Sequence, residues 1–494
     1  MMKTYLTIDQ STSATKALLY GEKGNCLDTE SVGHRQIYPK PGWVEHEPEE
    51  IWSNTKKAIQ SLLKRNSGWA HDIRFLSITN QRETILVFDK ETGAPLYNAI
   101  VWQCRRGDPI CRQLIDDGHD DLIRQKTGLK IDTYFSASKL KWLIANHKEI
   151  QNKLSSGDAL VGTIDTYLIY KLTQGQTFAT DHTNASRTLL YDIVSLQWDK
   201  TLCQIVDVPM QSLPTVRESN AKYGETDIDG LLNKKIPIYG VMGDSQASLF
   251  AQRCFEPGMI KSTFGTGSSV LLNIGSDFKL TDSGAMTTIA WCYGGKVTYS
   301  FEGIINYCAA TISWLKNQMQ LIDDPKDTAT LALAVNDNGG VYLVPAFAGL
   351  SAPYWNSHAK AAIVGLSAHS TKNHIVRAAL ESIAYQLRDV LEMMKTDSGV
   401  GLQSIHADGG ATANAFLMQF VADMAGLDLR VSHDPALSPL GAYMMGLLGS
   451  GECASFDNFV EFPRKILRFQ PSMDSSKADS CYKGWKRAVQ RVLD

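Results

Sequence analysis

The stretch TYLTIDQSTSATKALLY, from Thr4 to Tyr20, carries the pattern that decides the fold. Its first residues, 4–8, are rich in strand-forming types, and residues 9–16 are mostly small, hydroxyl-bearing or charged. Residues 17–20 are apolar again. This order predicts a strand, a tight hydroxyl-rich turn and a second strand.

A second stretch, MIKSTFGTGSSVLLNI from Met259 to Ile274, repeats this pattern about half a chain later. Its turn, Gly265–Ser269, again combines small and hydroxyl-bearing residues between two strand-like runs. Two ordinary hairpins would explain the repeat. The alternative is a duplicated domain in which two facing hairpins hold phosphate.

Helical patterns follow each hairpin. Between Asn373 and Thr396 the apolar residues recur every three to four positions, which predicts a helix with Asn373 as N-cap and Gly399 just past its end. A short strand at 404–407 then precedes a second helix through Phe416 and Met424. Strands that alternate with helices indicate an α/β fold with at least partly parallel sheets.

Composition excludes several classes of protein. The chain has 494 residues, 49 basic and 52 acidic, and 44% of its residues are hydrophobic, so a sizeable core in two to four domains is expected. The net charge of −3 argues against nucleic-acid binding and electrostatic membrane docking. Asp9 interrupts any signal-peptide pattern, and no apolar run approaches a membrane span. Nine scattered cysteines without a Cys-x-x-Cys pair predict free thiols in a reducing cytoplasm.

One candidate phosphate site is Asp408-Gly409-Gly410-Ala411, at the end of a predicted strand. Glycines there allow close backbone approach, and the following helix offers unpaired N–H groups, with Asn414 in reach of a base or ribose. A tight strand–helix turn explains the same residues. The chain has neither G-x-x-x-x-G-K-[ST] nor a G-x-G-x-x-G that opens a helix, which disfavours P-loop and Rossmann proteins.

Asp244 is the candidate general base, because it follows the apolar strand 236–242. A carboxylate at a strand end can accept the proton of a substrate hydroxyl. The alternative is an N-cap for a helix that begins near Ser245. A serine-hydrolase interpretation with Ser245 as nucleophile is disfavoured, since Ala247 stands where the elbow motif requires glycine.

Charged and aromatic residues at two further strand ends suit a polyhydroxyl ligand. Arg82 and Glu83 follow the run 75–80, and Trp102 follows 99–101. The charged groups hydrogen-bond hydroxyls while an indole packs on C–H faces; a surface ion pair and a core tryptophan are the alternatives. The contiguous segment Val44–Glu47 is not expected to share one metal coordination sphere.

Long motifs in this order resemble the FGGY carbohydrate kinase family, in its glycerol kinase-like branch. Tyr134–Leu143 resembles the first family signature, and Ala361–Leu366 with His374–Glu381 resembles the second. Further similar segments are Ile37–His46, Thr79–Thr84, Ala99–Arg106 and Thr183–Thr188. The resemblance extends from residue 4 to about 450.

The resemblance implies two actin-like (ribonuclease H-like) α/β domains, each a mixed sheet flanked by helices, with a cleft between them. The N-terminal domain, residues 1–247, would bind the sugar or polyol, and the C-terminal domain, residues 248–494, the nucleotide. The implied reaction is ATP-dependent phosphorylation of a terminal hydroxyl of a small polyol or sugar, with Mg²⁺ on the phosphates. Glycerol, giving sn-glycerol 3-phosphate, is the leading substrate. Nucleic-acid binding and membrane insertion are not expected, and a homodimer or homotetramer is compatible with the family.

The resemblance also assigns roles to residues. Asp244 matches the general base and Asp9 the carboxylate near the metal. The implied substrate contacts are Arg82, Glu83, Trp102, Tyr134, Asp244, Ser245 and Ser269. The implied nucleotide contacts are Thr12, Ser13, Lys16, Gly265, Thr266, Ala309, Ser313, Gly410 and Asn414.

Five of these positions depart from the family pattern, and two of them, Ala309 and Ser313, are substitutions within the nucleotide site. Lys16 stands where glycerol kinases usually have arginine, Ser245 replaces a glutamine, and Ser269 replaces a phenylalanine that packs on glycerol. A more open and polar pocket favours a larger substrate that supplies more hydrogen bonds, so a kinase for a tetritol, pentitol or ketopentose is the alternative. A non-catalytic actin-like regulator is disfavoured, because Asp9 and Asp244 are both present.

Overall fold

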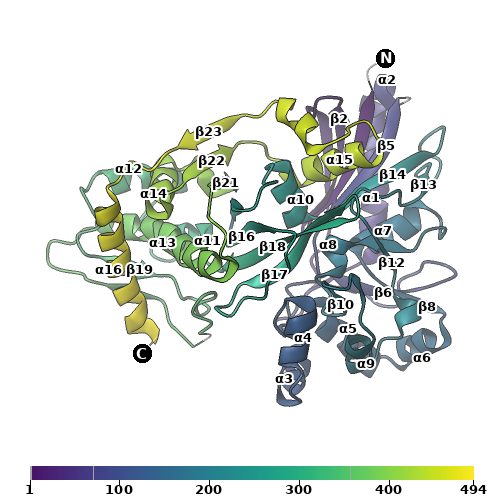
Figure 1. Ribbon diagram of the computed structural model, residues 1–494, viewed down its shortest axis with the longest axis horizontal. Helices are drawn as coiled ribbons and strands as arrows, with labels where there is room; N and C mark the ends of the chain where they lie inside the picture. Colours follow the sequence, from purple (N-terminus) through teal and green to yellow (C-terminus); the bar gives the residue numbers. More distant parts are fainter. Residues whose placement is uncertain (1–2, 71, 357, 494) are drawn as a thin grey trace. The chain divides into compact units, whose positions relative to one another are not determined.

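The computed structural model describes residues 3–70, 72–356 and 358–493 (Figure 1). The chain forms two compact units, each built from segments that are far apart in sequence. Unit 1 comprises residues 1–253, 287–299 and 436–463, and unit 2 comprises residues 254–286, 300–435 and 464–494. The family-implied fold class, α/β with mixed sheets flanked by helices, is confirmed in both units.

The elements of unit 1 fall into a main sheet, a smaller four-stranded sheet and their covering helices. Its strands are β1 (Thr4–Gln10), β2 (Ala14–Gly21), β3 (Cys26–Gly33), β4 (Glu45–His46), β5 (Ile73–Asn80), β6 (Ile85–Asp89), β7 (Ala99–Ile100), β8 (Ala159–Thr163), β9 (Ala179–Asp181), β10 (Tyr191–Asp192), β11 (Gln197–Trp198), β12 (Thr215–Arg217), β13 (Glu225–Thr226) and β14 (Ile236–Gly243). Its helices are α1 (Pro48–Arg65), α2 (Ser67–Ala70), α3 (Asp108–Asp116), α4 (Asp120–Thr127), α5 (Ser136–Asn146), α6 (Lys148–Ser156), α7 (Ile164–Leu172), α8 (His182–Ala185), α9 (Lys200–Val206), α10 (Asp244–Ala251) and α15 (Leu437–Gly449).

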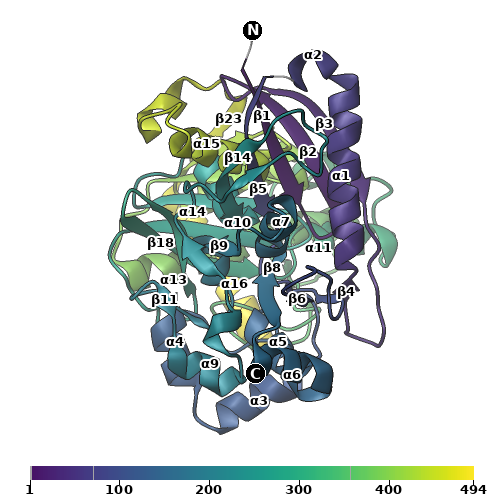
Figure 2. The ribbon, with the colours of Figure 1, turned by 90° about the vertical axis from the view of Figure 1, so that its right-hand side faces the viewer.

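The main sheet of unit 1 has the strand order β13-β14-β5-β1-β2-β3. The predicted first hairpin is confirmed, since β1 pairs antiparallel with β2, while β5 runs parallel to both β1 and β14. α1 lies along β2 and β3 (Figure 2). α15 comes from near the end of the chain but packs against β14, β5, β1 and α10 (Figure 1). Burial of the apolar strand residues against these helices is the main stabilising force of the unit.

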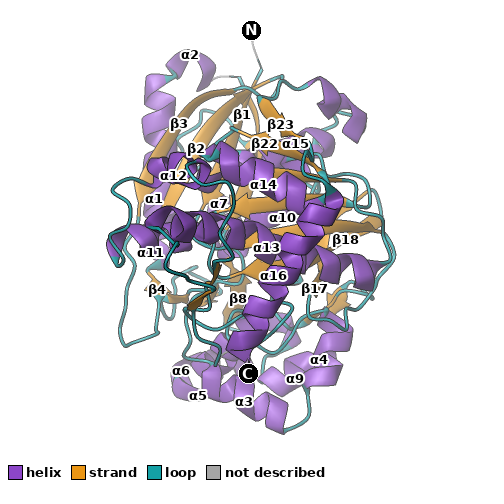
Figure 3. Cartoon of the chain, turned by 90° about the vertical axis from the view of Figure 1, so that its left-hand side faces the viewer, coloured by secondary structure: helices purple, strands orange, loops and turns teal. Residues whose placement is uncertain are grey.

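Unit 2 has a second mixed sheet with its own helical layer. Its strands are β15 (Met259–Phe264), β16 (Ser268–Gly275), β19 (Tyr342–Val344), β20 (Ala362–Val364), β21 (Ser404–Asp408), β22 (Asp428–Ser432) and β23 (Ile466–Phe469), and β17 (Met286–Tyr293) and β18 (Lys296–Ile305) have residues in both units. Its helices are α11 (Ala309–Asn317), α12 (Thr328–Leu333), α13 (Lys372–Ser398), α14 (Ala415–Ala425) and α16 (Ser475–Leu493). The helices α13, α14 and α16 pack on one another (Figure 3).

The two main sheets repeat one topology. In unit 1 the order β3-β2-β1-β5-β14-β13 begins at a hairpin, continues through parallel strands and ends on an antiparallel edge strand. In unit 2 the order β18-β16-β15-β21-β22-β23 does the same, with β15 antiparallel to β16, parallel to β21, and β22 antiparallel to β23. This repetition favours the duplicated-domain interpretation over two unrelated hairpins.

The N-terminus of α13 differs from the prediction. The helix begins at Lys372, so its N-cap is Thr371 and not Asn373. The backbone N–H of Thr371 donates to Nδ1 of His374 at 3.1 Å, which closes a capping box that places the cap two residues earlier. The C-terminal prediction is confirmed, because Gly399 ends the helix with φ +63°.

No helix within the described residues is long and apolar enough to cross a membrane. All nine cysteines are free thiols, and six of them are buried.

Candidate active site

The parallel register of unit 1 gathers the predicted catalytic residues at one edge of its main sheet. Gln10 at the end of β1 lies opposite Asn80 at the end of β5, and Asn80 lies opposite Gly243 at the end of β14. Residues within three positions of these strand ends therefore lie at one edge of the sheet. Asp9, Arg82, Glu83 and Asp244 occupy such positions.

Arg82 is the hub of this edge. Its side chain is only 4% exposed, and its Nε lies 3.3 Å from Oδ1 of Asp244 and 3.8 Å from Oε1 of Glu83. Its Nη1 donates to Oε1 of Gln246 at 3.2 Å, and its Nη2 donates to the hydroxyl of Tyr134 at 3.4 Å. One rigid guanidinium fork thus fixes four groups around one point.

Glu83 is held by a second buried arginine. Nε of Arg187 donates to its Oε1 at 2.6 Å, and both side chains are almost fully buried. The backbone of Glu83 has φ +61°, a conformation that costs about 1–3 kcal/mol in a non-glycine residue and is typical of functional sites. The hydroxyl of Ser136 donates to its carbonyl at 2.8 Å, which helps to hold this conformation.

Asp244 is the exposed member of the group. Its side chain is 41% exposed, and both contacts that hold it fall on Oδ1, from Nε of Arg82 and from the backbone N–H of Ser245 at 2.7 Å. No protein group in the described part of the chain donates to Oδ2. Asp244 is the first residue of α10 and does not cap it through its side chain, because the N-cap is Gly243.

The approach of Arg82 to Asp244 requires glycine at position 243. A Cβ on Gly243 would lie 2.8 Å from Cγ and 2.9 Å from Cδ of Arg82. The backbone N–H of Gly243 donates to Oγ1 of Thr183 at 2.8 Å, and that hydroxyl donates to the buried Asp181 at 2.9 Å. The strand end that precedes Asp244 is thus anchored to the buried Asp181 through Thr183.

Trp102 and Tyr134 form the aromatic wall of this edge. Their ring centroids are 5.3 Å apart at 66°, and Nε1 of Trp102 donates to the hydroxyl of Thr12 at 3.0 Å. The buried ammonium of Lys139 donates to the carbonyls of Thr133, Tyr134 and Phe135, which fixes the turn that carries Tyr134. Burial lowers the pKa of Lys139 to about 8.

Asp9 and Lys16 lie on opposite strands of the first hairpin. They are register partners, and Nζ of Lys16 lies 3.4 Å from Oδ2 of Asp9. Burial raises the pKa of Asp9; the Lys16 ammonium opposes this shift, and the negative charge of Asp244 adds to it. Thr12 and Ser13 lie in the turn between the strands, with Ser13 exposed.

Asp9 and Asp244 are two carboxylates close enough for their charges to interact, and such a pair suits a divalent cation. No cluster of three or more His, Cys, Asp or Glu side chains that could hold a metal by itself occurs in the described ranges. This donor set matches Mg²⁺, which is usually held by one or two carboxylates together with water and substrate phosphates.

In unit 2 the second predicted hairpin is joined to the start of α11. The backbone N–H of Ala309 donates to the carbonyl of Gly265 at 3.0 Å, and that of Ala310 donates to the carbonyl of Thr266 at 3.1 Å. The hydroxyl of Ser313, one helical turn further, donates to the carbonyl of Ala309 at 3.3 Å. Four of the predicted nucleotide contacts therefore form one local unit.

The turn after β21 also brings predicted residues to one place. Gly409 has φ +100°, and a Cβ there would lie 2.6 Å from the carbonyl oxygen of Phe264, so only glycine allows the strands to approach. A Cβ on the exposed Gly410 would meet nothing within 4 Å. Asn414 is the N-cap of α14, since its Oδ1 accepts from the backbone N–H of Leu417 at 2.9 Å. Its Nδ2 donates to Thr328 at 3.0 Å.

The predicted specificity residues Ser245 and Ser269 lie in different units. Ser245 is half-buried in the first turn of α10 in unit 1. Ser269 lies on β16 in unit 2, where its hydroxyl donates to Oε1 of the buried Glu302 at 3.4 Å. The Ser269 hydroxyl is therefore already engaged with a carboxylate of its own sheet.

Sequence reasoning did not assign Arg187 and Gln246, although both contact predicted site residues. Arg187 is separated from Glu83 by 104 residues, so local spacing could not connect them. A signal was present nonetheless, because Arg187 is the one charged residue of the motif Thr183–Thr188. Gln246 follows Asp244 by two positions and could have been included with it.

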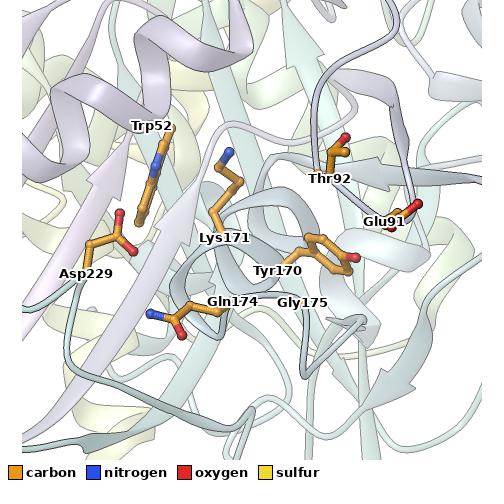
Figure 4. A pocket seen from close by; sticks show the side chains of 9 residues that line it. Trp52, Glu91, Thr92, Tyr170, Lys171, Gln174, Gly175 and Asp229 are labelled. Carbon is orange, nitrogen blue, oxygen red and sulfur yellow. The ribbon is translucent and has the colours of Figure 1, made fainter.

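A separate pocket lies elsewhere in unit 1 (Figure 4). Its volume is about 270 Å³, and it is lined by residues of α1, the β6–β7 connection and the end of α7, together with Asp229. Trp52, Lys171 and Tyr170 point toward it in Figure 4. None of the predicted substrate or nucleotide residues lines it.

Family models match both halves of the chain. The N-terminal-domain model of the FGGY family of carbohydrate kinases matches residues 4–251, and the C-terminal-domain model matches residues 260–450. The chain belongs to the FGGY family. The resemblance seen in the sequence is confirmed, and the protein is an ATP-dependent carbohydrate kinase.

Similar FGGY kinases cover the chain from end to end. A glycerol kinase of Caldanaerobacter subterraneus subsp. tengcongensis is 45% identical over 493 residues, covering 100% of this chain and 99% of that protein. Glycerol kinase 1 of Thermotoga maritima is 46% identical over 491 residues, with 99% of both proteins covered. The crystal structure of Plasmodium falciparum glycerol kinase with ADP superposes with a TM-score of 0.96 at 38% identity, covering 100% of this chain and 99% of that one.

Proposed function

We propose that this FGGY kinase transfers the γ-phosphoryl group of ATP to a terminal hydroxyl of glycerol, giving sn-glycerol 3-phosphate and ADP. The observation that carries the proposal is the arrangement around Arg82, which joins the exposed carboxylate of Asp244 to Glu83 and Tyr134. Glycerol kinases that are 45–46% identical over the full chain support glycerol as the substrate.

In the proposed reaction Asp244 is the general base. Its Oδ2 accepts the proton of the terminal hydroxyl while that oxygen forms a bond to the γ-phosphorus, and the bond from phosphorus to the β–γ bridging oxygen breaks. Arg82 holds Oδ1 and so orients the carboxylate. Glu83 accepts hydrogen bonds from the remaining hydroxyls, and the indole of Trp102 packs on the C–H groups.

The phosphates of ATP are proposed to lie on the two hairpins. Thr12, Ser13 and Lys16 would bind them from unit 1, and Gly265 and Thr266 from unit 2. Ala309, Ser313, Gly410 and Asn414 would contact the rest of the nucleotide. Mg²⁺ beside Asp9 would neutralise phosphate charge when bound. A kinase that draws on ATP and carries only free thiols fits the cytoplasm, which we propose as its location.

One observation favours a second candidate, a kinase for a tetritol, pentitol or ketopentose. Ser245 and Ser269 stand where the family usually has glutamine and phenylalanine, so the polyol site would be larger and more polar. Buried hydroxyls strengthen the binding of a substrate that forms hydrogen bonds with them and weaken the binding of one that leaves them unpaired. The Ser269–Glu302 hydrogen bond weakens this argument, because it satisfies one of the two serine hydroxyls internally.

The deciding experiment compares initial rates of ADP release with glycerol, tetritols, pentitols and ketopentoses at saturating MgATP. We expect kcat/KM to be highest for glycerol. A value for any larger substrate that clearly exceeds the value for glycerol would replace the leading candidate by the second one. The absence of phosphoryl transfer to every substrate would contradict both.

A further inference from the structure

His46, in β4, is completely buried and uses both of its ring nitrogens in a closed set of hydrogen bonds. The set runs through six residues of unit 1, which we call the His46 network: Trp102, Thr84, Gln81, His46, Gln36 and Thr12. Two of its members are predicted site residues, the polyol contact Trp102 and the phosphate contact Thr12.

One branch connects Trp102 to His46. The backbone N–H of Trp102 donates to the hydroxyl of Thr84 at 3.2 Å, and that hydroxyl donates to Oε1 of Gln81 at 2.9 Å. Nε2 of Gln81 then donates to Nδ1 of His46 at 3.3 Å. Every donor on this branch points toward His46.

The other branch connects His46 to Thr12 and closes the network. Nε2 of His46 donates to Oε1 of Gln36 at 3.0 Å, and Nε2 of Gln36 donates to the carbonyl of Thr12 at 2.6 Å. The Thr12 hydroxyl accepts from the indole Nε1 of Trp102 at 3.0 Å. The network therefore binds both the backbone carbonyl and the side-chain hydroxyl of Thr12, in the turn of the first hairpin.

The direction of each bond is fixed by carbonyl oxygens, which only accept. Gln36 must turn its amide nitrogen to the Thr12 carbonyl, and Gln81 has its amide nitrogen 3.4 Å from the carbonyl of Ser11. His46 therefore meets an acceptor on Nε2 and a donor on Nδ1, a pattern that only the neutral Nε2–H tautomer satisfies. Burial, with the neighbouring His34, lowers the pKa of His46 to about 3 and keeps it neutral.

We infer that His46 is a positioning residue that couples the placement of Trp102 in the polyol site to the placement of Thr12 in the phosphate hairpin. This inference rests on the proposed function, which assigns Trp102 and Thr12 to the two substrates. Removal of His46 deprives Gln36 and Gln81 of one partner each, although Gln81 keeps its bond to Oε1 of Gln10 at 3.0 Å. The positions of Trp102 and Thr12 are then expected to loosen together.

The test is a double-mutant cycle with His46→Phe, Thr84→Val and the combined variant. Each change cuts the network at a different point and keeps the side chain close in size. We expect each single variant to raise the KM of both glycerol and ATP about tenfold, with a smaller change in kcat. If the six residues act as one unit, each KM of the combined variant exceeds that of the more impaired single variant by no more than about twofold.

Independent local effects would instead multiply in the combined variant, and that result would overturn the inference. A loss of stability with both KM values unchanged would also overturn it. The matched control is His182→Phe. It removes a buried imidazole that lies outside the network and whose Nδ1 is 2.8 Å from the hydroxyl of Tyr191. This variant should leave both KM values unchanged.

A binding measurement separates failure of this inference from failure of the proposed function. If the wild type does not phosphorylate glycerol, the proposed function fails, while titration calorimetry with a non-hydrolysable ATP analogue still reports on Thr12. The inference predicts about tenfold weaker analogue binding in His46→Phe and in Thr84→Val. Unchanged analogue affinity in both variants would overturn it whatever the polyol substrate is.

Discussion

Nε of Arg82 lies 3.3 Å from Oδ1 of Asp244, across a glycine whose missing side chain makes the contact possible. The ion pair joins a nearly buried cation to an exposed carboxylate, so its main effect is on geometry. It orients the carboxylate, and within the described residues no protein donor reaches Oδ2. The same guanidinium holds Tyr134 and Gln246, so the proposed base and the proposed polyol contact Tyr134 share one support.

Asp244→Asn tests the general base. The substitution keeps the size of the side chain but removes its ability to accept a proton. We expect kcat for glycerol to fall by about 10²–10⁴-fold, the usual contribution of a positioned general base. Binding of ATP, measured by titration calorimetry, should stay nearly unchanged. Turnover close to the wild-type value would contradict the role assigned to Asp244.

Gly243→Ala tests whether the approach of Arg82 matters. The new Cβ would lie under 3.0 Å from two side-chain carbons of Arg82, so the guanidinium must move away from Asp244. We expect kcat/KM for glycerol to fall by about ten- to hundredfold, the equivalent of one charged hydrogen bond. Gly68→Ala is the matched control, because a Cβ at Gly68 meets nothing within 4 Å. Equal activity of the two variants would show that the Arg82 contact is dispensable.

Ser269→Phe tests the origin of substrate preference. Phenylalanine would restore the residue that the family usually places against the carbons of glycerol and would fill on the order of 150 Å² of surface. We expect the ratio of kcat/KM for glycerol to that for a tetritol to rise about tenfold. Ser269→Ala, which removes only the hydroxyl bonded to Glu302, separates the effect of volume from that of polarity. An unchanged ratio in Ser269→Phe would place residue 269 outside the polyol site.

The parts of this structure that sequence could predict are those encoded by local pattern. The hairpin at Thr4–Tyr20 and the helix that ends before Gly399 follow from alternation, periodicity and a glycine terminator, and the structure contains both. The N-cap of that helix was predicted wrongly, because Thr371 and His374 form a reciprocal capping box that a scan for single caps does not detect.

Long-range pairings lie beyond such patterns. Glu83 and Arg187 are separated by 104 residues, and nothing near either residue specifies the other as its partner. Likewise, α15 returns from near the end of the chain to pack on β14, which only the three-dimensional packing of unit 1 determines. The tautomer of His46 depends on two glutamines that approach it from different segments. Family resemblance supplied candidate residues, but the contacts among them required the structure.

Asp165 is a fully buried carboxylate in the first turn of α7, and its titration predicts a pH dependence of stability. It accepts hydrogen bonds of 2.6 Å from both Thr163 and Thr180, yet burial first, and then the charge of Asp181, raises its pKa from 3.8 to about 7. Between these two pH values the folded protein keeps the proton that the unfolded chain has released. The free energy of unfolding that Asp165 contributes is therefore fully present below pH 3.8 and is lost as the pH rises to 7.

Asp165→Asn removes this titration while keeping the shape of the side chain. The quantity to follow is the free energy of unfolding of the wild type minus that of the variant. We expect this difference to fall by about 1.4 kcal/mol per pH unit between pH 5 and pH 7 and to level off above pH 7. Urea unfolding at pH 5, 6, 7 and 8 measures the difference. Asp181 also anchors Thr183, whose hydroxyl accepts from the backbone N–H of Gly243. Asp165→Asn relieves the charge repulsion on Asp181 and should leave these contacts intact, so we expect Asp244 to keep its place and kcat to stay nearly unchanged. A difference in stability that does not vary with pH would mean that Asp165 stays ionised in the folded protein.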